Sequence, residues 1–239
     1  MKRLVIGLFL SSLILTGVTK IYAEEEPWES NISLGVNATR GNVDSVFTTF
    51  LFDTQKKRTD SLFRGDFSVA YGESDNETTT NEIMLSSQYN KNITDRTFWS
   101  LMGSAEFNEL SGIDSRYTGA LGYGYYFIKE AKRLLEFSAG VGYIAEKFDT
   151  GKDNNYFTTF LAERYEHKME NSKLWNNLAF YPEVSDFSNF ILKGEIGFEA
   201  NINSKLGLRL VLKDIFNNTV EAGRDKNDVI IMSLLSYKI

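Results

Sequence analysis

The chain of 239 residues has no cysteine and a single histidine, and these scarcities exclude several kinds of protein. Without cysteine there can be no disulfide framework and no thiolate zinc site. Beyond the extreme N-terminus the chain lacks the run of roughly 18 apolar residues that a transmembrane helix needs. It also lacks a basic excess: 26 basic residues face 32 acidic ones, unlike the balance typical of nucleic-acid-binding proteins.

The N-terminal segment, residues 1–23, has the pattern of a secretory signal peptide. Lys2 and Arg3 precede an apolar core at 4–15, and the small residue Ala23 marks a cleavage point. A retained membrane anchor is the alternative, but this core is too short to span a bilayer comfortably. We therefore expect an exported mature chain that comprises residues 24–239.

Alternation of apolar and polar residues runs through almost all of the mature chain and predicts β-strands. No charged residue falls on the apolar face of the seven clearest segments. These are 28–38, 63–71, 99–107, 117–127, 135–145, 190–200 and 206–212. Five further strands are predicted at 45–56, 79–90, 156–166, 173–181 and 227–239.

The connections between these twelve segments mostly alternate in length. The short ones are 56–61, 91–95, 128–133, 167–172 and 201–204. The longer ones are 73–78, 108–115, 146–155, 182–189 and 216–226, and the tight turn at 40–42 breaks the pattern. Short turns at one end and longer loops at the other are typical of outer-membrane barrels. An even number of strands then places both termini on the short-turn, periplasmic side.

A secreted β-sandwich would also alternate and has to be considered as an alternative. The predicted strands are long for a sandwich, and their apolar faces carry aromatic residues toward both ends. Such residues include Trp28, Phe63, Tyr71, Trp99, Phe107, Tyr117, Phe127 and Tyr143. Membrane barrels place aromatic girdles at these two levels. The sequence therefore predicts an all-β fold, a twelve-stranded antiparallel transmembrane β-barrel.

Several short motifs resemble the YdiY-like, salt-induced outer-membrane protein family, a domain of unknown function. Residues 32–42 contain Leu-Gly, five residues, then Gly-Asn. The other motifs are Arg116 ahead of Leu-Gly-Tyr at 121–123, Val-Gly-Tyr at 141–143, and Asp228 ahead of Ser-Leu-Leu-Ser-Tyr at 233–237. The resemblance spans nearly the whole mature chain and implies an outer-membrane β-barrel without an established biochemical activity.

If the apolar face meets lipid, the polar face lines the lumen. The inward charged set is then Glu29, Asp53, Arg64, Asp66, Glu82, Glu106, Arg116, Glu136, Glu146, Lys193, Glu195, Glu199, Arg209 and Lys213. This mixed, acid-leaning set has no Arg/Lys track for acidic sugars or phosphate. Two interpretations stay open: ion pairs that brace a narrow interior, and a weakly cation-preferring pore.

Two register predictions follow from the turns. A turn at 201–203 places Glu195 opposite Arg209 and avoids contacts between like charges. A turn centred on Ala131 pairs small inward residues of neighbouring strands. These are Ala120, Gly122, Gly124, Ser138, Gly140 and Gly142. The small patch either permits strand bending in a narrow barrel or accommodates a loop or ligand.

A membrane-embedded hydrolase is the rival class, since barrels of this size include lipases. Its general base near neutral pH would have to be His167, which lies at a strand end between cationic neighbours Arg164 and Lys168. We predict no catalytic residues, no cofactor and no metal site. The expected partners are outer-membrane lipid and the assembly machinery, with no nucleic acid, and the sequence specifies no oligomeric state. The predicted role is a narrow, mixed-charge channel or a structural barrel in the outer membrane.

Overall fold

The computed structural model describes residues 27–39 and 45–239, and every regular element in these ranges is a strand. The strands are β1 (Glu29–Thr39), β2 (Ser45–Lys57), β3 (Ser61–Ser74), β4 (Glu77–Asn92), β5 (Thr97–Asn108), β6 (Ile113–Lys129), β7 (Arg133–Phe148), β8 (Asp153–Lys168), β9 (Ser172–Pro182), β10 (Phe190–Asn201), β11 (Leu206–Asn217) and β12 (Asn227–Lys238). The predicted signal peptide and the turn at 40–42 lie outside the described residues. Among those that are described, no helix is long and apolar enough to cross a membrane.

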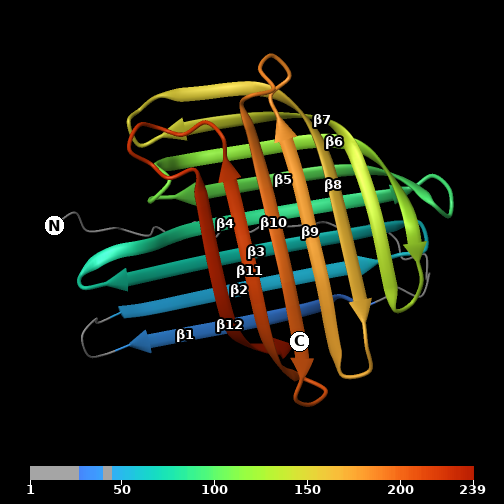
Figure 1. Ribbon diagram of the computed structural model, residues 1–239. Helices are drawn as coiled ribbons and strands as arrows, with labels where there is room; N and C mark the ends of the chain where they lie inside the picture. Colours follow the sequence, from blue (N-terminus) through green and yellow to red (C-terminus); the bar gives the residue numbers. More distant parts are fainter. Residues whose placement is uncertain (1–26, 40–44) are drawn as a thin grey trace, which may run out of the picture.

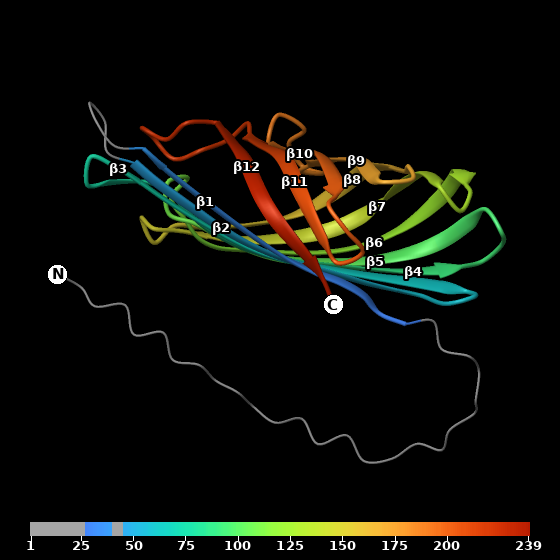
Figure 2. The same ribbon diagram turned by 90° about the horizontal axis from the view of Figure 1, so that it is seen from below.

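Each strand pairs antiparallel with its neighbours in the chain, and β12 pairs with β1, so the sheet closes into a barrel. The predicted fold class is confirmed. In Figure 1, β1–β5 pass behind β9–β12 at a steep angle, and Figure 2 shows the same two walls from below. We call the end that carries the connections β2–β3, β4–β5, β6–β7, β8–β9 and β10–β11 the turn end, and the opposite end the loop end.

Several strands are longer than the roughly 9–11 residues that cross a membrane: β6 has 17 residues and β4 has 16. The longer loop expected at 73–78 is therefore wrong. Asp75 and Asn76 alone join β3 to β4, with φ angles of 50° and 65°. Asp and Asn tolerate this left-handed conformation, so the hairpin closes tightly and both strands continue to it.

The outward face of the barrel is an apolar belt. Leu101, Leu121 and Val141 lie directly opposite one another on β5, β6 and β7, and each is more than half exposed. Aromatic rings flank the belt at both levels. Trp99 packs edge-on against Tyr123 toward the turn end, with ring centroids 5.8 Å apart. Tyr143 and Phe157 do so toward the loop end at 5.2 Å. This surface matches a hydrocarbon environment between two interfaces.

The seam between β1 and β12 is closed in two different ways. Backbone pairing runs from Asn31 opposite Lys238 to Leu34 opposite Leu235 at the turn end. Closer to the loop end, inward side chains of β12 contact those of β2 instead. The apolar side chains that take part are Ile230, Met232, Leu234, Phe47 and Leu51.

The predicted contact between Glu195 and Arg209 is wrong. Glu199 lies opposite Arg209, and Glu195 lies opposite Lys213. The turn is longer than expected because the Asn203 side-chain oxygen accepts hydrogen bonds from the backbone N–H groups of Lys205 (2.8 Å) and Leu206 (2.9 Å). This register gives both glutamates a cationic residue opposite, which stabilises the strand pair.

The substitution Leu121→Arg tests the belt. A cationic side chain near the middle of the lipid-facing surface should lower the free energy of unfolding in phospholipid vesicles by about 2–4 kcal/mol. Ala131→Arg, in the exposed turn between β6 and β7, is the matched control and should leave it almost unchanged. Equal effects at both positions would contradict a lipid-facing Leu121.

Candidate functional site: the barrel lumen

Side-chain contacts between strands on opposite walls show which residues point into the lumen. Arg64 of β3 contacts Glu136 of β7, and Lys193 of β10 contacts Glu106 of β5. Neither pair belongs to neighbouring strands, so each contact crosses the interior. The alternation of a strand then places the other charged residues of the same faces inward as well.

At the loop end, Arg116 of β6 is the centre of a buried polar network. Its guanidinium donates to Glu106 at 2.9 Å, to Glu146 at 2.5 Å and to Asn217 on the opposite wall at 2.9 Å. Lys193 Nζ reaches the second oxygen of Glu106 at 2.7 Å. The network links five strands, β5, β6, β7, β10 and β11, and satisfies charges that would be costly to bury alone.

An apolar cluster fills the interior at the same end. Its buried members come from β7, β8, β10 and β11, and two partly buried residues pack against it. The residues are Ile144, Tyr156, Ile191 and Ile215, with Met84 and Tyr181. Together with the Arg116 network, this cluster narrows the lumen toward the loops.

Arg64 and Glu136 form a bidentate ion pair across the lumen, closer to the turn end. Nη1 lies 2.6 Å and Nη2 3.2 Å from the two carboxylate oxygens, and both side chains are less than a tenth exposed. Gln88 accepts a further bond from Nη1 at 3.3 Å. Paired donors and acceptors of this kind fix both position and orientation.

Arg209 is the corresponding residue beside the seam. Its Nε donates to Glu199 at 2.7 Å, and its Nη1 bonds Asp53 of β2 and Ser33 of β1, the latter at 3.2 Å. Asn31 donates to Asp53 at 2.7 Å. Side chains of four strands thus meet where the barrel closes.

Sequence reasoning missed an ionic group around Glu166 at the turn end. Lys173 lies 3.1 Å, Arg164 3.4 Å and Lys168 3.7 Å from its carboxylate oxygens. The alternation of β8 is obscured because Tyr156 and Phe160 are apolar residues on the inward face. The charged pattern at 164, 166 and 173 is the signal that could have revealed the group.

Four predicted lumen residues have no ion pair among the described residues. One of them, Glu195, accepts hydrogen bonds from Trp175 and Asn177. Glu82 is buried opposite Asn108, and its Oε2 has no hydrogen-bond partner there. Lys213 Nζ donates to Ser68 on the facing wall at 3.3 Å. Asp66 accepts a bond from Ser86 at 3.3 Å.

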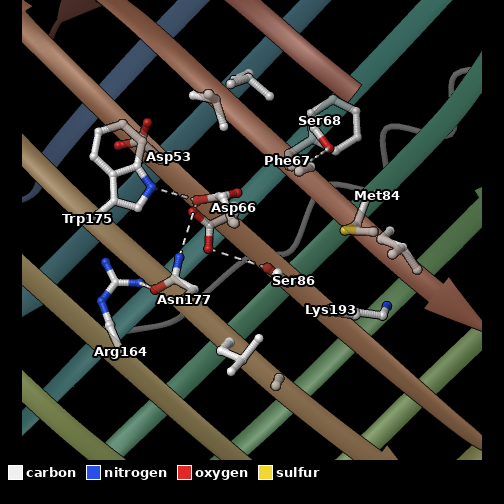
Figure 3. Close-up of a pocket in the computed structure, with 18 of the residues that line it drawn as sticks. Asp53, Asp66, Phe67, Ser68, Met84, Ser86, Arg164, Trp175, Asn177 and Lys193 are labelled. Atoms are coloured by element: carbon white, nitrogen blue, oxygen red, sulfur yellow. Dashed lines mark hydrogen bonds between the residues drawn. The ribbon is translucent and has the colours of Figure 1, made fainter. Parts of the chain in front are cut away.

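Cavities occupy the middle of the lumen and its turn end. The cavity at the turn end, which we call the mouth cavity, has a volume of about 410 Å³ and is lined by residues such as Trp28, Lys168 and Ile239. Two further cavities, which we call the inner cavities, have volumes of about 250 and 230 Å³. Asp66 and Arg164 line all three, so the cavities adjoin one another. Figure 3 shows Asp66 between Trp175, Asn177 and Ser86 in the first inner cavity. The cavities thus extend from the middle of the lumen to its turn end, and the Arg116 network and the apolar cluster lie on their loop side.

The small patch has the expected register: Gly122 lies opposite Gly140, and Gly124 opposite Ser138. Aromatic rings of the neighbouring strands fill the space next to these glycines. A Cβ atom at Gly140 would lie 2.7 Å from Cε1 of Phe160, and one at Gly124 would lie 2.7 Å from Cε1 of Phe98. Elsewhere in the patch, Ala120 and Ser138 border the cavity of about 230 Å³, and Gly142 adjoins the Ala120 side chain.

His167, the one histidine, does not face the lumen cavities. It shares the outward face of β8 with Tyr165, and the two ring centroids lie 6.5 Å apart. In the part of the chain that the structure describes, no group of three or more histidine or carboxylate side chains could hold a metal ion. The lumen contains cross-strand ion pairs such as Arg64–Glu136 and Arg116–Glu106.

Comparison with known proteins agrees with this architecture. The family described as protein of unknown function, DUF481, matches residues 32–239. The chain belongs to the DUF481 family. The YdiY-like resemblance of its motifs is consistent with that membership. No curated protein sequence matches this DUF481 chain.

Solved structures show the fold to which the DUF481 chain is similar. The NanC porin shares 9% sequence identity over 87% of this chain and 96% of its own, with a TM-score of 0.50. The KdgM porin shares 6% over 89% and 99%, with a TM-score of 0.47. The COG4313 outer membrane channel from Pseudomonas putida F1 shares 10% over 93% and 99%, with a TM-score of 0.45. At these identities the similarity concerns the fold alone.

A double-mutant cycle on Arg64 and Glu136 tests the bracing. Arg64→Ala should lower the free energy of unfolding by about 3–5 kcal/mol, because it leaves a buried carboxylate without its partner. Adding Glu136→Ala should restore a substantial part of the lost free energy of unfolding. Urea titrations of the four proteins in vesicles measure this recovery as the coupling energy between the two residues. The exposed pair Lys91–Asp60 is the control and should show no measurable coupling. Additive effects at positions 64 and 136 would contradict a cross-lumen pair.

Proposed function

We propose that this protein is an outer-membrane barrel with a narrow, mixed-charge lumen that passes water and small ions and carries no catalytic activity. In this proposal residues 1–23 direct export, the outer-membrane assembly machinery inserts the mature chain, and both termini face the periplasm. The turn end, with the mouth cavity, then opens to the periplasm. The observation that carries the proposal is the row of adjoining cavities bounded by cross-lumen ion pairs.

Two features support a membrane barrel over a soluble β-sandwich. The apolar belt faces outward on consecutive strands, and the charged residues face inward, the reverse of a soluble protein. Closure leaves no free sheet edges like those of an open sandwich. The fold is similar to that of the NanC protein, which its name describes as a porin.

The dimensions of the interior favour the passage of small solutes over large ones. The mouth cavity has a volume of about 410 Å³, and the Arg116 network and the apolar cluster lie between the inner cavities and the loops. Charges of both signs alternate along the lumen, which favours neither an anionic sugar track nor a purely acidic filter. The orientation of His167 gives no support to a hydrolase.

Planar-bilayer recordings test this function. Wild-type protein should give small conductance steps, because Arg116 and its partners obstruct the loop end. The triple variant Arg116→Ser, Glu106→Ser and Glu146→Ser removes the polar part of this obstruction and releases Lys193 from Glu106, while the apolar cluster stays in place. Its conductance steps should be larger than those of wild type. The double variant Lys91→Gln and Asp60→Asn, which alters an exposed pair outside the lumen, should conduct like wild type. Wild-type steps as large as those of the triple variant, or the absence of conductance in both, would contradict the proposal.

A further inference from the structure

The inner cavity of about 250 Å³ is lined by charged and apolar side chains. Its carboxylates come from β2, β3 and β10, and its cations from β8 to β11. Most of these charged groups form ion pairs with other residues of the protein. Two carboxylates, those of Asp66 and Glu195, are the exception.

Neutral groups are the hydrogen-bond donors to both carboxylates. Glu195 accepts a bond from the indole Nε1 of Trp175 at 2.6 Å and one from Asn177 at 3.2 Å. Asp66 accepts a bond from Ser86 at 3.3 Å. Within the described ranges 27–39 and 45–239, neither carboxylate forms a salt bridge. Figure 3 shows Asp66 in the centre of the cavity, with Trp175, Asn177 and Ser86 around it.

The cations that line the cavity are mostly engaged elsewhere. Arg164 and Lys173 both contact Glu166, at 3.4 and 3.1 Å. Lys193 contacts Glu106 at 2.7 Å. Arg209 binds Glu199 at 2.7 Å, as well as Asp53.

Lys213 is the one lining cation without a salt bridge among the described residues. Its Nζ donates to Ser68, and the residue lies opposite Glu195 on the neighbouring strand. Against this one cation, the cavity contains two carboxylates without a salt bridge. A carboxylate removed from bulk water is stabilised when a cation approaches it.

Apolar side chains also line the cavity, on the same strands as several of the charged ones. They are Leu51, Met84, Val211 and Ile215, together with the ring of Trp175. Val211 and Trp175 belong to the buried cluster that continues to β12 beside the seam. A mainly apolar lining with a few polar groups is the usual composition of a site for small molecules.

We propose that this cavity binds a small organic cation: an ammonium group between Asp66 and Glu195, with its hydrocarbon part against Leu51, Val211 and Ile215. The ligand enters from the turn end, because Asp53, Asp66, Arg164, Lys173 and Arg209 line both this cavity and the mouth cavity. This inference goes beyond the proposed passage of ions, since binding here does not require a path to the loop end.

Fluorescence of Trp175 reports binding directly, because its indole donates to Glu195. In the variant Trp28→Phe, Trp99→Phe, Trp175 is the single tryptophan of the chain. Reconstituted in phosphatidylcholine vesicles, this protein should show a saturable change of emission with n-hexylammonium. Heptanoate and hexanol, which have the same hexyl chain without the positive charge, should produce no saturable change.

Asp66→Asn in the same background should weaken the affinity for hexylammonium about ten-fold or more, because a hydrogen bond to a charged group contributes on that order. This variant leaves the bond between Trp175 and Glu195 in place. Glu109→Gln, in the connection between β5 and β6, is the matched control and should bind like the parent. Leu51→Asn, in the apolar lining, provides a second variant should Asp66→Asn fail to fold, and it should also weaken binding.

Equal responses to hexylammonium and hexanol, or unchanged affinity in both folded variants, would overturn the inference. Its failure is distinguishable from failure of the proposed function. A barrel that conducts ions but gives no saturable signal would refute the binding site alone, and one that binds hexylammonium without conducting would refute the passage alone.

Discussion

Hydrocarbon offers no hydrogen-bond partners, and this constraint governs both surfaces of the protein. Every backbone N–H and C=O group inside a membrane must be satisfied by another strand, so the sheet has to close. Closure places one face of each strand in lipid and the other in an enclosed lumen. Residues such as Leu101 and Leu121 meet the first requirement. The second face must then accommodate its charges in a confined space, which explains why Arg64, Arg116 and Arg209 each bind at least one carboxylate.

The two halves of the lumen solve this packing problem differently. Toward the loops, aliphatic and aromatic side chains pack beside the Arg116 network. Toward the turns, the polar groups are spread around cavities, and Arg164 and Asp66 border each of them. Close packing and open space therefore lie in different parts of one small interior.

The strand count and the outward face could be predicted from the sequence because both depend on local alternation. Where turn chemistry sets the register, prediction was less secure. The register of β10 and β11 depends on a side-chain bond of Asn203 that lengthens the turn, and the tight Asp75–Asn76 turn removed an expected loop. Contacts across the lumen could not be predicted from the sequence. The partner of Arg64 is determined by the curvature of the barrel and not by the alternation of residues along the strand. Filling of the glycine patch by Phe98 and Phe160 likewise depends on how neighbouring strands tilt.

The partial pairing of β1 with β12 has a consequence for the order of assembly. The backbone N–H of Ile239 donates to the carbonyl of Ser30 at 3.0 Å, and Lys238 lies opposite Asn31, so the barrel is closed by the two strands that lie farthest apart in the sequence. The ring therefore cannot be completed before β12 has been synthesised. A deletion within residues 235–239 would act on the closing step itself, while an insertion in the loop between β11 and β12 would leave these contacts intact.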